Sequence, residues 1–141
     1  MAGTEQLMMF RWPITVYYED TDAGGVVYHS NYLNFFERAR TEWLRALGIS
    51  QQQLLADDLA FVVRHADIDF RKAARFEQQF EVVTTIAETK RASLIFDQQL
   101  VDADGQVYCA AKVTVVSVSL SRMKPVAVPP HILQEFKQSE R

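Results

Sequence analysis

Apolar side chains recur at three- and four-residue spacing in one clear stretch of the sequence, between residues 31 and 48. The apolar positions are Tyr32, Phe35, Phe36, Ala39, Trp43 and Leu47, and polar residues fill most of the rest. This spacing predicts an amphipathic helix with one broad buried face. Ser30 or Asn31 is expected to cap its start, and Gly48 to end it. Because two Phe and a Trp share that face, we expect the helix to lie at the centre of the core.

The rest of the chain has mainly the two-residue period of β-strands. Strands are expected at 14–18, from 61 (Ala66, Ile68 and Phe70 on one face), from 76 (Phe76, Phe80 and Val82 on one face), from 92 and at 107–120. Asp104-Gly105 predicts a hairpin turn. Short helices are expected after Ser50, where Gln53 completes a capping box, and after Pro129-Pro130. One long helix followed by long antiparallel strands predicts an α+β domain whose sheet curves around the helix.

Length and charge narrow the classes of function. The 141 residues fit a single domain, 1–141, and the formal net charge of -3 gives no positive field for nucleic acid. The single cysteine, Cys109, lies in an apolar stretch, which favours a buried thiol in a reducing compartment. The N-terminus lacks the pattern of a signal peptide, and the apolar runs are too short to span a membrane. We therefore expect a cytoplasmic protein.

The loop before the long helix carries the candidate chemistry. Asp20 and Asp22 lie in a stretch with the paired glycines Gly24 and Gly25. A helix N-terminus presents unpaired N–H groups that can hold an oxyanion, so a carboxylate beside it suits acyl transfer. Taken on pattern alone, however, the two carboxylates are better explained as turn formers.

The stretch YYEDTDAGGVVYHSNYLNFFERARTEWL resembles the N-terminal signature of the hotdog-fold thioesterases of the 4-hydroxybenzoyl-CoA thioesterase class. It is most similar to the YbgC branch, which is associated with the Tol-Pal system, and the later RxSLIF and DADGQ patterns also fit. The resemblance implies a hotdog fold, in which an antiparallel sheet wraps a central helix. It also implies homodimers that join two sheets and often pair into tetramers. The implied substrate is an acyl thioester of coenzyme A, or of acyl carrier protein as a possible partner.

The resemblance places the catalytic aspartate on Asp22, with Tyr18 and His29 as its partners. An ionised Asp22 acts either as general base on water or as a nucleophile that forms a mixed anhydride. The backbone N–H groups near His29 and Ser30 are the candidate oxyanion site. His29 either takes part in the chemistry or simply begins the helix, and Tyr18 either bonds Asp22 or packs.

Coenzyme A carries phosphates, which need cations. Lys90-Arg91 and Arg122-Lys124 are the candidate phosphate-binding residues, and the cluster Arg71-Lys72-Ala73-Ala74-Arg75 is no better supported. Taken alone, each pair is slightly better explained as charged residues on a solvent-exposed turn. No His, Cys or Asp cluster has the spacing of a metal site, and no phosphate-binding glycine loop or G-x-S-x-G elbow occurs, so we expect no metal and no cofactor beyond the substrate's own coenzyme A.

Two other functions stay open. A hotdog-fold dehydratase is disfavoured because the DTDAGGVVYH signature belongs to thioesterases. The other is a module that binds acyl carriers or partner proteins of the Tol-Pal system and has little turnover. Only an experiment distinguishes this module from an enzyme. The acyl chain preference is not encoded in any pattern of this sequence.

Overall fold

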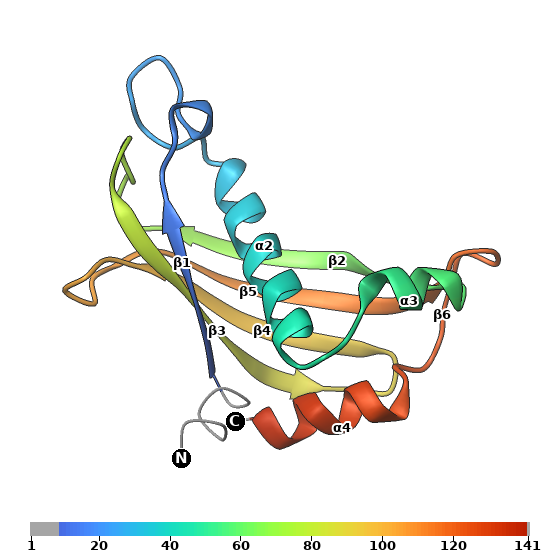
Figure 1. Cartoon of the computed structure of the whole chain (residues 1–141). Helices are drawn as coiled ribbons and strands as arrows, with labels where there is room; N and C mark the ends of the chain where they lie inside the picture. The colour runs from blue at the N-terminus through green and yellow to red at the C-terminus, as the bar shows by residue number, and fades with distance from the viewer. Residues whose placement is uncertain (1–8, 141) are drawn as a thin grey trace.

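The computed structural model describes residues 9–140, which form a curved antiparallel sheet around one long helix (Figure 1). The strands are β1 (Met9–Thr15), β2 (Leu59–Phe70), β3 (Gln79–Thr89), β4 (Ser93–Val101), β5 (Val107–Ser119) and β6 (Lys124–Pro125). The helices are the 3-10 turn η1 (Tyr18–Asp20), α2 (Asn31–Ala46), α3 (Gln51–Ala56) and α4 (Pro130–Ser139). The α+β arrangement predicted from the sequence is confirmed. Residues 1–8 and 141 of the predicted single domain lie outside the described residues.

The strands follow the order β1-β3-β4-β5-β2, with the short β6 beside β5. Neighbouring strands are antiparallel, and the pairing shifts register in β2, β3 and β4. Such irregularities bend and twist a strand, so they help the sheet curve around α2. Within residues 9–140, β2 pairs with β5 alone, so its other edge is free.

Helix α2 lies against the concave face of the sheet (Figure 1). The predicted stripe is confirmed, because Tyr32, Phe35, Phe36, Ala39 and Trp43 are buried. Gly48 has a φ of +80°, which confirms it as the residue that ends the helix. The predicted side-chain cap at the start is wrong, because neither Ser30 nor Asn31 caps the helix with its side chain. Asn31 instead uses its side chain to bond Asp20.

The predicted first strand is misplaced. It was expected at 14–18, but β1 covers Met9–Thr15 and the chain turns into η1 at Tyr18. Pro13 lies inside β1 and opposite Glu81, which is tolerated because β1 is an edge strand. Phe76 is also misplaced, since it lies in the loop before β3 and is exposed, whereas Phe80 and Val82 are buried in β3.

The later elements are confirmed. β4, β5 and α4 lie where the pattern predicts them, and Gly105 at a φ of +81° makes the turn between β4 and β5. The Oγ of Ser50 accepts a hydrogen bond from the N–H of Gln53 at 3.1 Å, as the predicted cap of α3 requires. Among the helices of residues 9–140, none has the length and apolar character needed to cross a membrane.

Candidate active site

Asp22 lies in a tight turn between η1 and α2, and the turn fixes its carboxylate. Its Oδ1 accepts hydrogen bonds from the N–H of Gly24 at 2.8 Å and of Val26 at 3.4 Å. Gly25 has a φ of +78°, and a Cβ on Gly24 would lie 3.3 Å from Oδ1 of Asp22. Both glycines therefore suit the turn. Within residues 9–140, Oδ2 of Asp22 accepts no hydrogen bond, so one oxygen stays available for water or substrate.

Asp20 is the carboxylate that ties this loop together. Its side chain is buried, with 4% of its surface exposed. Oδ2 accepts from the N–H of Tyr17 at 2.9 Å, and Oδ1 accepts from Nδ2 of Asn31 at 2.8 Å. The start of η1 and the first residue of α2 are thus joined through one carboxylate. Asp20 is more than the turn former that the sequence predicts.

His29 lies immediately before α2 and contacts the end of β2. Its ring packs edge-on against Phe70 with centroids 6.4 Å apart, and the same phenyl ring contacts Tyr32 at 5.5 Å. His29 is exposed to solvent. The imidazole is therefore placed between the loop of Asp22 and the final residue of β2, where it can reach a ligand.

Tyr18 packs rather than bonding Asp22. Its side chain is 78% exposed and contacts the ring of Phe76 edge-on at 5.9 Å. Among the described residues, its hydroxyl makes no hydrogen bond with Asp22. The structure places Tyr18, Asp22 and His29 on one continuous segment before α2, but it joins them through the backbone and not through side-chain bonds. Glu19, as predicted, faces solvent.

The start of α2 offers backbone donors next to this loop. In the described part of the chain, the N–H groups of His29 and Ser30 donate to no protein acceptor, whereas the N–H of Asn31 bonds the carbonyl of Tyr28 at 3.0 Å. Free N–H groups at a helix N-terminus carry partial positive charge. The oxyanion site at this segment stays a prediction, and these N–H groups are available for it.

The predicted phosphate-binding residues lie far from Asp22 within one chain. Lys90 and Arg91 are exposed on the β3–β4 turn, Arg122 is exposed on the β5–β6 turn, and Lys124 is exposed at the start of β6. Those turns lie at the end of the sheet where β2 begins. Phe70 is the last of the 12 residues of β2 and lies about 35 Å away along that strand. In Figure 1 these turns lie at one end of the sheet, and the loop of Asp22 lies at the other end.

The segment 71–76 lies much closer to the candidate site. The N–H of Val27 bonds the carbonyl of Ala74 at 2.9 Å, and the N–H of Phe76 bonds the carbonyl of Gly25 at 3.1 Å. Arg75 is exposed beside the loop, and Arg71 is already paired with Asp69 at 2.8 Å. The sequence shows this basic cluster, but only the pairing of the two loops reveals its place beside Asp22.

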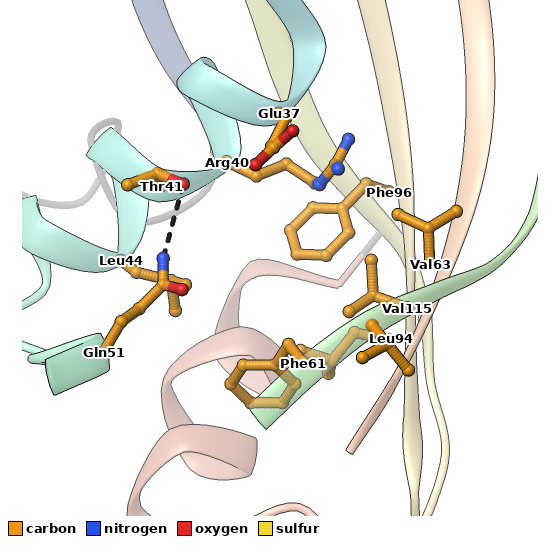
Figure 2. A pocket seen from close by; sticks show the side chains of 11 residues that line it. Glu37, Arg40, Thr41, Leu44, Gln51, Phe61, Val63, Leu94, Phe96 and Val115 are labelled. Carbon is orange, nitrogen blue, oxygen red and sulfur yellow. Dashed lines mark hydrogen bonds between the residues drawn. The ribbon is translucent and has the colours of Figure 1, made fainter. Parts of the chain in front are cut away.

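A pocket opens between α2 and the start of β2 (Figure 2). Its volume is about 300 Å³, and its wall is mostly apolar, with Phe61, Leu94 and Phe96 on the sheet side. Arg40 and Glu37 of α2 line the same pocket. The sequence does not predict this pocket, because an arginine such as Arg40 is expected among the polar residues on the exposed side of α2.

Cys109 lies near the segment before α2, opposite Phe70 in the pairing of β2 with β5. Cys109 is buried, and burial raises the pKa of its thiol to about 12, so it is protonated at neutral pH and unsuited to act as a nucleophile. Within residues 9–140, no group of three His, Cys, Asp or Glu side chains could hold a metal ion.

Comparison with known proteins identifies the family of the chain. Residues 16–136 match the model of the thioesterase-like superfamily. The chain is 49% identical over 130 residues to the acyl-CoA thioester hydrolase YbgC of Escherichia coli O6:H1, covering 92% of this chain and 97% of that protein. It is 48% identical to the acyl-CoA thioesterase YbgC of Haemophilus influenzae, covering 90% and 93% of the two chains. The structure of a 1,4-dihydroxy-2-naphthoyl-CoA thioesterase from Synechocystis superposes with a TM-score of 0.82 at 27% identity, covering 93% and 94%.

Proposed function

This chain belongs to the thioesterase-like superfamily and has its hotdog fold, and we propose that it hydrolyses acyl-CoA thioesters through the carboxylate of Asp22. One observation carries the mechanism. Asp22 has one oxygen held by the N–H groups of Gly24 and Val26 and the other unbonded, in a loop that adjoins the free N–H groups at the start of α2. A fixed base beside an oxyanion site is the arrangement that acyl transfer needs.

Two routes of hydrolysis fit this arrangement. In the first, Asp22 takes a proton from water while the water oxygen attacks the thioester carbonyl carbon. In the second, Asp22 itself attacks and forms a mixed anhydride, which water then cleaves. In both routes the negative charge develops on the carbonyl oxygen, where the N–H groups of His29 and Ser30 stabilise it. The C–S bond then breaks, and the thiolate leaves and is later protonated from solvent. The imidazole of His29 orients the attacking water.

Arg75 is our candidate for a phosphate of coenzyme A within the same chain. It is exposed in the segment that pairs with the loop of Asp22, and a guanidinium offers paired donors to phosphate oxygens. Lys90, Arg91, Arg122 and Lys124 stay predictions for this role. They belong to the same site only if a second copy of the chain supplies them.

A homodimer that pairs two β2 strands would bring these basic residues to the candidate site of the other copy. The free edge of β2 exposes Val62, Val63 and Phe70, with 41%, 52% and 50% of their surfaces accessible. A long apolar edge invites pairing with another strand. In an antiparallel pair of β2 strands around a two-fold axis, the start of one strand lies opposite the end of the other. The Arg122–Lys124 turn of one copy would then approach His29 of its neighbour. Three further statements also stay proposals: dimers pair into tetramers, acyl carrier protein is a second carrier of the substrate, and the protein is cytoplasmic.

The Asp22→Asn variant tests the function. It preserves shape but removes the negative charge, so we expect turnover of acyl-CoA to fall at least about a hundredfold. Thiol release from a panel of acyl-CoAs measures it, and the thermal unfolding temperature should stay within a few degrees of the parent. Asp104→Asn, in the exposed β4–β5 turn, is the matched control. A folded Asp22→Asn protein with full activity would refute the mechanism, and wild-type protein without activity on any acyl-CoA would refute the function.

A further inference from the structure

Arg40 is the basic side chain on the wall of the pocket between α2 and β2, which we call the α2–β2 pocket and which Figure 2 shows. Only 9% of its surface is exposed, although it carries a guanidinium. Phe96, Leu94 and Val115 line the sheet side of the pocket together with Phe61, Val62 and Val63 of β2. The pocket thus combines an apolar wall with one buried cation.

The hydrogen bonds of Arg40 leave most of its donors unused. Its Nη1 donates to Oε1 of Gln98 at 2.9 Å. Nε2 of Gln98 in turn donates to the carbonyl of Phe36 at 2.9 Å and to Oγ1 of Thr84 at 3.0 Å, which fixes the amide with its oxygen toward the arginine. A guanidinium has five N–H donors. In the described part of the chain, the bond to Gln98 is the only hydrogen bond that the guanidinium of Arg40 makes.

The charge of Arg40 is only partly compensated within the chain. Burial lowers the pKa of Arg40 to about 10, with Glu37 acting in the opposite direction, so the guanidinium is still charged at neutral pH. Glu37 also lines the pocket but is exposed, and among the described residues it forms no ion pair with Arg40. A buried charge without a partner is costly, so an oxygen acceptor that enters the pocket would gain from binding it.

We propose that the α2–β2 pocket receives the acyl group of the substrate and that Arg40 selects acyl groups with an oxygen acceptor at the end remote from the thioester. The class includes acyl chains that end in a carboxylate or a hydroxyl. This inference rests on the proposed function. It also uses the antiparallel pairing of β2, which sets the pocket of one copy, at the start of β2, opposite Phe70 and His29 of the other.

The test compares three acyl-CoAs of equal chain length: hexanoyl-CoA, 6-hydroxyhexanoyl-CoA and the mono-CoA thioester of hexanedioic acid. The wild-type protein should cleave the carboxylate-ended thioester with a kcat/KM at least equal to that for hexanoyl-CoA. Arg40→Met should lower kcat/KM about tenfold or more for the carboxylate-ended substrate and less for the hydroxylated one, because charge-assisted hydrogen bonds are the stronger. Hexanoyl-CoA should change by less than about threefold. Arg40→Lys should retain part of the selectivity, and Arg38→Met, on the exposed side of α2, should retain all of it.

Several outcomes would overturn the proposal. An equal loss on all three substrates would show that Arg40 only braces α2 against Gln98. A monomeric Arg40→Met protein in sedimentation would show that it bonds a second copy instead. If the variant does not fold, the wild-type panel decides, because a preference of more than about tenfold for hexanoyl-CoA over both oxygenated substrates contradicts the role of Arg40. Failure of the proposed function looks different, since hexanoyl-CoA itself would then stay uncleaved by the wild-type protein.

Discussion

Asp58 illustrates how one carboxylate holds two distant segments together. With a φ of +64°, it leads from α3 into β2. Its carboxylate accepts three hydrogen bonds at 2.7 Å, from the N–H and hydroxyl of Ser121 and from the hydroxyl of Ser119. These bonds, with the Ser121 hydroxyl the largest contributor, lower the pKa of Asp58 below its usual range. A carboxylate whose pKa is lower in the folded protein contributes stability above its unfolded value of about 3.9, and the contribution is lost as the pH falls through the folded value.

The Asp58→Asn variant should therefore show a pH-dependent defect. Asparagine tolerates the positive φ but lacks the charge that the two serines stabilise. We expect its unfolding temperature to lie below that of the wild type at pH 7, and the difference to shrink as the pH falls below about 4. Thermal unfolding between pH 7 and pH 3 measures this, with Asp104→Asn as the control. If the difference in unfolding temperature is the same at every pH, the stabilisation does not come from the charge of Asp58.

The resemblance makes Asp22 the candidate carboxylate, but the sequence does not predict how that carboxylate is held. The signature and the glycine pair mark a turn, and the turn is present. Its two amide bonds to Oδ1 depend on the loop closing onto Ala74 and Phe76, which are remote in sequence. Nor does any local pattern reveal that Arg40 is buried, because arginine on a helix is usually solvated.

At the scale of elements, Asp20 connects η1 to α2. Replacing Asp20 with alanine leaves the N–H of Tyr17 and the amide of Asn31 without their acceptor, which should cost about 1–3 kcal/mol. The loop of Asp22 should also lose its fixed position, so we expect kcat for acyl-CoA to fall by more than stability alone explains. Urea unfolding and turnover below the transition measure the two effects.

Glu19→Ala provides the control for Asp20→Ala, because Glu19 is the exposed neighbour on the same turn. It should change neither stability nor kcat by a measurable amount. If Asp20→Ala keeps full kcat while it loses stability, Asp20 supports the fold and has no part in positioning Asp22.

Trp43 joins α2 to three other elements. Its ring contacts Phe10 of β1 at 6.2 Å, Phe96 of β4 at 6.1 Å and Phe136 of α4 at 5.2 Å. Trp43→Ala should cost about 3–5 kcal/mol in urea unfolding. Nε1 of Trp43 is buried without a partner in the described residues, so Trp43→Phe, which removes that unpaired N–H, should cost much less. Similar costs for the two variants would contradict this account.

Elements with strong internal periodicity could be predicted, and those defined by distant contacts could not. α2 and β5 carry enough regular apolar positions to be found from sequence. β1 was misplaced because its pairing with β3 extends the strand back through Pro13 to Met9, although the local signals favour a start after proline. Phe76 was misplaced because it packs on Tyr18 of another loop instead of continuing the alternation of β3.

At the scale of the molecule, the sheet closes around α2 but leaves β2 unpaired on one side. The loop of Asp22 touches the end of that strand through His29 and Phe70, and the α2–β2 pocket opens at its start. The two features are separated by most of β2 within one chain. Pairing of two β2 edges would bring each loop to the other chain's pocket, so the proposed dimer and the proposed activity depend on the same strand.

Val63→Arg tests that dependence. Val63 is 52% exposed on β2, and in a two-fold pair the introduced charges would approach each other across the new interface. We expect sedimentation to show a monomer that unfolds near the wild-type temperature. Turnover of acyl-CoA should fall at least about tenfold, because the pocket and the loop no longer meet and because Val63 itself lines the pocket. Val83→Arg on β3, three strands away in the sheet, is the control and should stay oligomeric and active. A monomeric Val63→Arg protein with full turnover would mean that a single chain holds the complete site.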